Sequence, residues 1–272
     1  MIEVPEIFKQ EINTIYPYEN YIIFEAWIAL KNLPETKREY LPINFTSYFV
    51  NNKYGTDKEA LQRLQNFINE LPTDKKYWAI CQYDDGILVD TSRIDLLVFN
   101  MSKKTGVEMP LLNMPHSYKH DGAKNIMASF IGSHTHPIRE NVFRLNDNIG
   151  YYISDIQHGV VDFCKVLASS VFGLCPRGYG LNSFRICECM QYGTVPVYIS
   201  DNFVNCFDID FSEYGVLVPE SESHDIVRIL KSYTPLQIVD MQDKISEVYK
   251  EYYTYEGALN KIIKYLESEH NS

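Results

Sequence analysis

The segment from Val171 to Asp201, VFGLCPRGYGLNSFRICECMQYGTVPVYISD, constrains the fold more than any other part of the chain. Its apolar start, Val171–Leu174, has the length of a buried strand, and the glycine- and proline-containing CPRGYGL that follows has the composition of a tight loop. Asn182 or Ser183 can cap a helix, and Val195–Ile199 is β-branched and apolar enough for a second buried strand. The segment therefore predicts a parallel strand–helix–strand unit that binds its ligand beside the loop.

The polar side chains around this loop predict an anion site. Arg177 belongs to the loop, and Arg185 lies in the first turn of the expected helix. The unpaired N–H groups and partial positive charge of a helix N-terminus add to these two guanidinium groups, and the combination suits a pyrophosphate. Glu188 could accept hydrogen bonds from two ribose hydroxyl groups, or it could form an ordinary surface ion pair with Arg185. The spacing leaves both interpretations open, and neither G-x-G-x-x-G nor a P-loop occurs here.

The order of these residues resembles the signature of the exostosin-like glycosyltransferases, glycosyltransferase family 47. The resemblance covers the C-terminal half of the chain and little before it, and Cys189 and Thr194 depart from the Ala and Cys common in the family. It implies an α/β fold of the GT-B type, with two Rossmann-like domains facing across a cleft, and an inverting enzyme with a nucleotide-sugar donor. The matching residues are Cys175-Pro176-Arg177-Gly178, Ser183, Arg185, Glu188, Gly193, Pro196-Val197 and Ser200-Asp201.

The resemblance also implies which residues bind the donor. Arg177 and Arg185 would face the diphosphate, Ser183 would cap the helix toward it, and Glu188 would hold the ribose. Family members often have a Phe-x-Gly turn followed by an arginine, which Phe130-Ile131-Gly132 and a later arginine match here. The expected donor-binding residues are Gly132, Ser133, His134, Arg139, Arg177, Gly178, Tyr179, Asn182, Ser183, Arg185 and Glu188.

No metal and no other cofactor is expected. Arginines and helix amides can stabilise the leaving UDP without a metal, and the one Asp-x-Asp spacing, Asp208–Asp210, lies beyond the donor residues and suits a solvated turn. His134 and His136 have the spacing of a metal pair, but no further ligands stand near them in the sequence. A hydrogen bond from His134 to the donor and a simple exposed loop histidine both stay open.

An inverting displacement needs a base that accepts the proton of the acceptor hydroxyl. Asp84 and Asp85 follow an expected strand over Tyr77–Cys81, where catalytic groups are common in α/β proteins, although Asp-Asp-Gly is also ordinary turn chemistry. Glu25, in an expected helix over Ile23–Leu33, is the third candidate, and a surface charge is the favoured alternative for it. The candidate catalytic residues are therefore Asp84, Asp85 and Glu25.

With 272 residues, the chain can hold two modest domains. We expect an N-terminal acceptor-binding domain over residues 1–121 and a C-terminal nucleotide-sugar-binding domain over residues 122–272, whose last helix can cross back to the first domain. A hydrophobic content of 45% and a charged content of 22% are those of a globular protein. The net charge of −11 argues against binding to nucleic acid or to an anionic membrane.

The chain is expected to be soluble and cytoplasmic. Met1–Asn20 carries charges throughout, and no apolar run approaches the ~18 residues of a membrane span. The six cysteines have neither the spacing of a zinc site nor the density of a disulfide framework, so we expect buried thiols in a reducing compartment.

These features predict an inverting glycosyltransferase that moves a sugar from a UDP-sugar to a glycan hydroxyl and forms a β-linkage. The resemblance allows UDP-galactose, UDP-xylose, UDP-glucuronate, UDP-arabinose and UDP-N-acetylglucosamine; the sequence does not choose, and UDP-xylose is our suggestion. The alternative is a non-catalytic nucleotide- or glycan-binding module of the same fold. An NAD-dependent epimerase is disfavoured because its glycine fingerprint is missing. The acceptor and the oligomeric state are left open.

Overall fold

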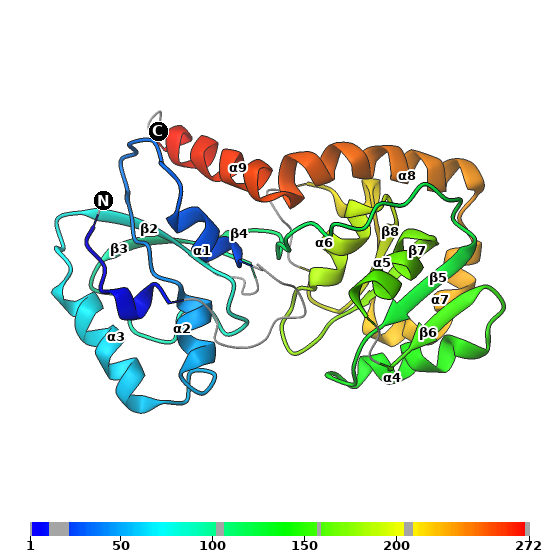
Figure 1. Cartoon of the computed structure of the whole chain (residues 1–272), viewed down its shortest axis with the longest axis horizontal. Coiled ribbons are helices and arrows are strands. Elements are labelled where there is room, and N and C mark those ends of the chain that lie inside the picture. Colours follow the sequence, from blue (N-terminus) through cyan, green and yellow to red (C-terminus); the bar gives the residue numbers. More distant parts are fainter. Residues whose placement is uncertain (1, 11–21, 102–105, 157–158, 204–208, 270–272) are drawn as a thin grey trace. The chain divides into compact units, whose positions relative to one another are not determined.

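The computed structural model describes residues 2–10, 22–101, 106–156, 159–203 and 209–269 (Figure 1). Its contacts divide the chain into two compact units, Met1–Met109 with Tyr255–Ser272, and Pro110–Thr254. The first unit therefore ends before the junction expected near Asp121, and the C-terminal helix belongs to it. Each unit is built on one parallel sheet, which confirms the expected α/β class with two Rossmann-like domains.

The first unit has a four-stranded parallel sheet in the order β1-β2-β3-β4. Its two long strands are β2 (Lys76–Cys81) and β3 (Asp95–Asn100), which pair along their whole length, and β1 (Glu39–Tyr40) and β4 (Val107–Glu108) are short edges. The helices of this unit are η1 (Glu6–Phe8), α1 (Phe24–Ala29), α2 (Phe45–Asn51), α3 (Lys58–Glu70) and α9 (Tyr255–Ser268).

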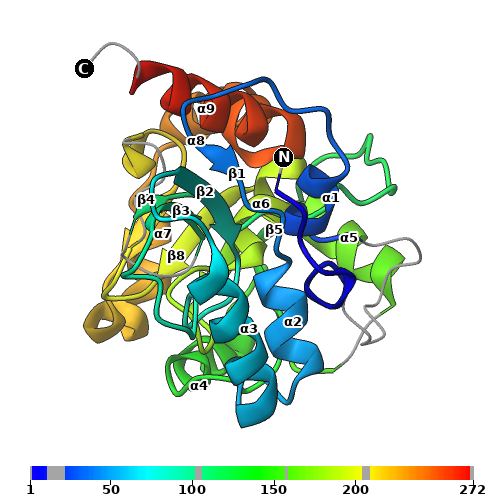
Figure 2. The same cartoon turned by 90° about the vertical axis from the view of Figure 1, so that its left-hand side faces the viewer.

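Helices α2 and α3 lie side by side (Figure 2), and the Tyr48 hydroxyl of α2 donates to the Ala60 carbonyl of α3 over 2.8 Å. Leu64 and Ile68 of α3 are fully buried with Tyr77 of β2, so they form the core face of this helix. Asp57 caps α3, because its side chain accepts hydrogen bonds from the amides of Glu59 and Ala60.

Helix α9 joins the first unit because its apolar face and its last turn both find partners there. Ala258, Ile262 and Leu266 are buried. At the end of the helix, Arg38 Nε lies 2.8 Å from a Glu269 carboxylate oxygen, and its NH1 lies 2.6 Å from Asp95 Oδ1. An ion pair with two acids on a mostly buried arginine fixes the end of α9 against β3.

The second unit has a five-stranded parallel sheet in the order β6-β5-β7-β8-β9. Helices α5 and α6 contact β7, α8 contacts β8, and α4 contacts β6 and β7; Figure 1 shows α8 above this sheet and α4 below it. The strands are β5 (Ile126–Ile131), β6 (Tyr151–Ser154), β7 (Ser170–Pro176), β8 (Val195–Ile199) and β9 (Val216–Val218). The helices are α4 (Ile138–Phe143), η2 (Arg144–Asp147), α5 (Val160–Ala168), α6 (Phe184–Gln191), η4 (Phe211–Glu213), η5 (Glu220–Asp225), α7 (Ile226–Lys231), α8 (Pro235–Val248) and η6 (Tyr249–Tyr253).

The β7–α6–β8 unit confirms the fold predicted for residues 171–201. Strands β7 and β8 are parallel neighbours, and the Ser183 side chain caps α6 by accepting from the Arg185 amide over 3.3 Å. Helix α6 lies so close to β7 that a Cβ atom on Gly173 would stand 2.2 Å from Cys189 Sγ. On α6, Phe184 is only half-buried, whereas Glu188 is buried.

Five of the six cysteines fall in the described part of the chain, and all five are buried free thiols as expected; Cys206 lies outside it. Residues 87–89 form no strand, because Ile87, Leu88 and Val89 pack their side chains against the first core instead of joining the ladder.

Candidate functional site

The strand order of the second sheet marks one edge as the place for a ligand. Strand β6 continues the sheet on one side of β5, whereas β8 and β9 continue it on the other side of β7. Loops that follow two such neighbouring strands diverge, and open α/β sheets bind ligands at this point, beyond the carboxyl ends of the strands. Here the two loops are residues 132–137, after β5, and residues 177–183, after β7.

Arg139 of α4 ties these two loops together. Its NH1 donates to the Ser133 carbonyl over 2.8 Å, while Nε and NH2 donate to the carbonyls of Arg177 and Pro176 over 3.1 and 3.4 Å. A Cβ atom on Gly178 would lie 3.3 Å from NH2, so a glycine suits this close approach. Burial, and then the charge of Arg185, lower the pKa of Arg139 to about 10. The structure thus assigns all three guanidinium nitrogens of Arg139 to the backbone.

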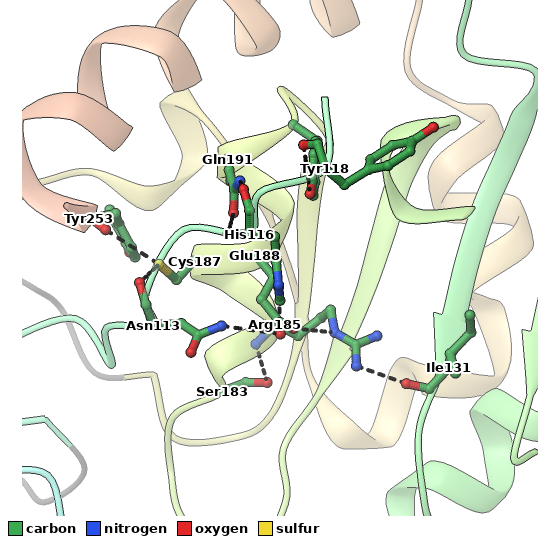
Figure 3. Close-up of polar contacts among 11 residues, drawn as sticks. Asn113, His116, Tyr118, Ile131, Ser183, Arg185, Cys187, Glu188, Gln191 and Tyr253 are labelled. Atoms are coloured by element: carbon green, nitrogen blue, oxygen red, sulfur yellow. Dashed lines mark hydrogen bonds and ion pairs between the residues drawn. The ribbon is translucent and has the colours of Figure 1, made fainter. Parts of the chain in front are cut away.

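Arg185 lies at the switch point itself (Figure 3). Its NH2 donates to the carbonyl of Ile131, the last residue of β5, over 2.8 Å, and its Nε donates to Glu188 over 2.9 Å. The guanidinium carbon stands 4.5 Å from the ring centroid of Phe163. The remaining nitrogen, NH1, makes no hydrogen bond with any described residue, so Arg185 has a donor group left for a ligand.

Arg139 and Arg185 both lie close to the ring of Phe130. Its ring centroid lies 5.5 Å from the guanidinium carbon of Arg139 and 5.8 Å from that of Arg185. After burial, the positive charge of Arg185 is the second cause that lowers the pKa of Arg139, so the two guanidinium groups repel each other here. An anion placed here would relieve that repulsion.

Glu188 is buried, with 8% of its surface exposed. Burial opposes ionisation, but the charge of Arg185 and the contact with His116 outweigh it and lower the pKa of Glu188. Its Oε1 atom lies 3.3 Å from His116 Nε2 and 3.4 Å from Asn113 Nδ2, and Oε2 accepts from Arg185 (Figure 3). The ion pair with Arg185 exists, but the alternative that placed it on the surface is wrong.

A carboxylate offers about four acceptor positions, and the described residues occupy three of those of Glu188. One position is left, where the expectation had two ribose hydroxyl groups. Sequence reasoning missed Asn113 and His116, which lie 75 and 72 residues from Glu188. No local pattern relates residues so far apart; only the fold brings them together.

The other expected donor residues lie in the same two loops. Arg177 NH2 donates to the Tyr179 carbonyl over 3.0 Å, and its NH1 stands 3.9 Å from Glu220. The Asn182 side chain accepts from the Ser183 amide over 2.8 Å, which fixes the entry to α6. The Gly132 amide donates to the carbonyl of Ser154 over 3.1 Å, so this glycine holds the end of β5 to β6.

His134 is exposed and faces two carboxylates. Its Nδ1 contacts Glu140, and its Nε2 lies 3.2 Å from Asp155. These hydrogen bonds, that of Glu140 first, raise the pKa of His134. The imidazole also stacks on Phe143, with 4.2 Å between the ring centroids. Both ring nitrogens therefore have protein partners, and a role for His134 toward the donor stays a prediction.

The three candidate bases meet at one loop of the first unit. Asp84 and Asp85 are half-buried in the turn after β2, and the loop begins at Gln82. Glu25 is 1% exposed, and its carboxylate accepts from the amides of Gln82 and Thr46 and from the Thr46 hydroxyl. The expected surface position of Glu25 is wrong, because these hydrogen bonds hold the carboxylate inside.

The described residues contain neither a metal-binding cluster nor a membrane-spanning helix. Within them, no three His, Cys, Asp or Glu side chains converge as a metal site requires, and Asp208 of the Asp-x-Asp spacing lies outside them. Metal independence stays a prediction. No helix among the described residues combines the length and the apolar composition that crossing a membrane needs.

Comparison with known proteins gives the same family as the sequence motif. A model of the Exostosin GT47 domain matches residues 84–233, which is more than half of the chain. An exostosin-1 homolog of Caenorhabditis elegans is 33% identical over 93 residues, 34% of this chain and 24% of that protein. Human Exostosin-2 is 31% identical over 99 residues, 36% of this chain and 14% of that protein, so each match spans a quarter or less of the relative. A Staphylococcus aureus TarM structure aligns with 77% of this chain and 46% of its own, at a TM-score of 0.47 and 11% identity.

Proposed function

The chain belongs to the exostosin GT47 domain family, and from this premise we propose that it moves a sugar from a UDP-sugar to a hydroxyl group of a glycan acceptor. Its GT-B fold class, α/β with two Rossmann-like units, agrees with that activity. The observation that carries the proposal is the position of Arg185. Its guanidinium group, which hydrogen-bonds to the protein through Nε and NH2, lies at the switch point of the second sheet. A second arginine, Arg139, lies beside it, and α6 begins there.

The diphosphate of the donor is the anion that this site fits. The whole chain carries a net charge of −11, yet Arg139 and Arg185 stand together here and Arg177 belongs to the adjoining loop. NH1 of Arg185 is a donor that can bind a phosphate oxygen, and the partial positive charge at the start of α6 adds to it. Arg139 supplies charge and holds the loops, rather than hydrogen bonds to the ligand.

The ribose is proposed to contact Glu188. Only one acceptor position of its carboxylate is left by the described residues, so the contact is with a single hydroxyl group. Because Glu188 is charged, this hydrogen bond is stronger than one between neutral groups. The ligand contact thus differs from the two-hydroxyl contact that the sequence suggested.

The proposed reaction is a direct displacement with inversion. The acceptor oxygen forms its bond to the anomeric carbon as the bond from that carbon to the β-phosphate oxygen breaks, and the electron pair stays on the leaving UDP. The arginines and the partial positive charge at the start of α6 stabilise this charge without a metal. The acceptor proton passes to Asp84 or Asp85. An α-linked UDP-sugar then gives a β-linkage, and UDP-xylose is the donor we suggest.

Calorimetric titration tests the donor site. Wild type should bind UDP more tightly than GDP or ADP, with the same affinity in the presence of EDTA. Arg185→Lys and Arg177→Ala should each weaken UDP binding by about tenfold or more, because the first removes the hydrogen bond from NH1 and the second removes a positive charge beside the diphosphate. Arg228→Ala is the matched control, since the Arg228 side chain is exposed on α7 and pairs only with Asp225 among the described residues. A wild-type protein that binds none of the nucleotides would refute the proposal.

Turnover separates an enzyme from a binding module of the same fold. With a panel of UDP-sugars and glycan acceptors, Asp84→Asn or Asp85→Asn should abolish transfer while UDP binding persists. Retained transfer in both variants would remove these two residues as the base. UDP binding without transfer from any donor would favour the non-catalytic module.

A further inference from the structure

His116 reaches the donor site from outside the β7–α6–β8 unit. It lies in the extended segment 110–118, just before β5, and its side chain is 2% exposed. Its Nε2 atom lies 3.3 Å from Glu188 Oε1. None of the roles assigned above to the donor-binding residues includes this histidine.

Gln191 attaches the backbone of His116 to the same helix. The Gln191 side chain accepts from the His116 amide over 2.9 Å and donates to the His116 carbonyl over 2.8 Å (Figure 3). Glu188 and Gln191 are three residues apart on α6 and therefore share a face of the helix. One residue is thus held to this face at three points, two on its backbone and one on its ring.

Aromatic rings fix the orientation of the imidazole. Tyr192 lies parallel to it, with an interplanar angle of 9°, and Phe163 meets it edge to face at a centroid distance of 5.8 Å. Four titratable or charged described residues surround the ring. Glu188 and its ion-pair partner Arg185 lie on α6, Tyr192 follows the end of α6, and Cys164 lies on α5. The ring can therefore hold one orientation toward Glu188.

We propose that His116 is a positioning residue of the donor site, which holds the carboxylate of Glu188 so that its remaining acceptor position faces a ribose hydroxyl. This inference rests on the proposed function. The terminal torsion of a glutamate side chain is broad, so only its partners can fix the plane of the carboxylate. Without His116, the 3.4 Å contact with Asn113 is the one that Oε1 keeps among the described residues.

Loss of His116 would also change how Glu188 pairs with Arg185. In the structure, Arg185 donates to Glu188 through Nε alone. Carboxylates commonly bind arginine with both oxygens, and a carboxylate free to turn would take this arrangement. Such a rotation of the Glu188 carboxylate would occupy the acceptor position proposed for the ribose and the Arg185 NH1 donor proposed for the phosphate. His116 therefore keeps the two groups of the site separate.

The experiment compares two ligands that differ only in the ribose, UDP and 2′,3′-dideoxy-UDP. Calorimetry gives their affinities for wild type, His116→Phe, His116→Gln and the control His120→Phe. The control changes another histidine, half-buried and four residues further along the chain. Wild type should prefer UDP by about tenfold, the effect of one hydrogen bond to a charged group. His116→Phe should reduce this preference to about twofold or less, and its affinity for dideoxy-UDP should fall less than its affinity for UDP.

The two remaining variants sharpen the comparison. His116→Gln keeps a side-chain donor and should recover part of the preference, and His120→Phe should match wild type. If His116→Phe does not fold, His116→Asn, whose amide is too short to reach Glu188, takes its place.

Several outcomes would overturn the inference. An unchanged UDP preference in His116→Phe would show that Glu188 needs no such support. Equal losses for both ligands would reduce His116 to a structural residue, and a wild type without a preference would remove the ribose contact. If wild type binds neither ligand, the proposed function itself fails, which the other outcomes do not imply.

Discussion

Arg185 and Glu188 lie one helical turn apart on α6 and form a 2.9 Å ion pair that is almost entirely inside the protein. Lys244 and Glu247 have the same spacing on α8 and a contact of 3.3 Å, but they are exposed. Equal spacing in the sequence therefore produces two different interactions. The exposed pair is screened by water, whereas the two charges of the buried pair have little solvent around them and depend on each other.

This contrast predicts the effect of neutralising each glutamate. Glu188→Gln leaves Arg185 and His116 buried without their carboxylate, and we expect the free energy of unfolding to fall by about 3–5 kcal/mol. Glu247→Gln removes an exposed pair and should change it by less than about 1 kcal/mol. Urea denaturation of both variants measures the difference. Similar small losses would show that the Arg185–Glu188 pair is effectively solvated.

The pH dependence of stability should report on His116. Burial opposes its charge, but hydrogen bonds with Cys164 and Glu188 outweigh it and raise the pKa of His116 to about 9, above the value of about 6.5 in an unfolded chain. The folded state then binds the proton more tightly, so this contribution is complete below pH about 6.5 and is lost as the pH rises through about 9.

The measurement is the free energy of unfolding from pH 6 to pH 10 for wild type and His116→Gln. The difference between the two proteins should shrink as the pH rises. Taking this difference removes the contribution of Lys124, whose pKa burial lowers to about 8. Lys124 donates to the carbonyls of Ala168 and Tyr192, at the ends of α5 and α6. Parallel curves would exclude a titration of His116 in this range.

Gly173 should tolerate no side chain while Cys189 stands opposite. A Cβ atom there would lie 2.2 Å from the sulfur, so Gly173→Ala must separate α6 from β7 and should cost about 1–3 kcal/mol. The double variant with Cys189→Ala removes the sulfur and should recover part of the loss. Gly159→Ala is the control, because nothing lies within 4 Å of its Cβ position. A double variant no more stable than Gly173→Ala would place the strain elsewhere.

Glu25 should act in folding rather than as the base. Glu25→Gln places an amide donor against the backbone donors of Gln82 and Thr46, and we expect a loss of about 2–3 kcal/mol in unfolding free energy. Turnover per folded molecule should stay within about tenfold of wild type, since general-base catalysis contributes at least about a hundredfold. A hundredfold loss of turnover in a folded Glu25→Gln protein would make Glu25 the base. Glu70→Gln, on exposed helix surface, is the control.

The strand–helix–strand core of the second unit could be predicted from the sequence alone. Its signals are local, because a glycine- and proline-containing loop, a serine cap and a terminal glycine each act within a few residues. Strand β8 was predicted to its exact bounds for this reason, and β7 and α6 nearly so. Thr234 and Pro235 likewise define the start of α8 through a capping box.

Only the tertiary structure decided the strand order, and with it the switch point where Arg185 meets the end of β5. It also decided the surroundings of the two buried glutamates. The sequence favours a surface position for Glu25 and allows one for Glu188. In the structure, Glu25 accepts a hydrogen bond from Gln82, 57 residues away, and Glu188 contacts His116, 72 residues away. Local sequence fixes which backbone forms a helix or a strand. The partners of a buried charge depend on packing between distant segments, which no short pattern records.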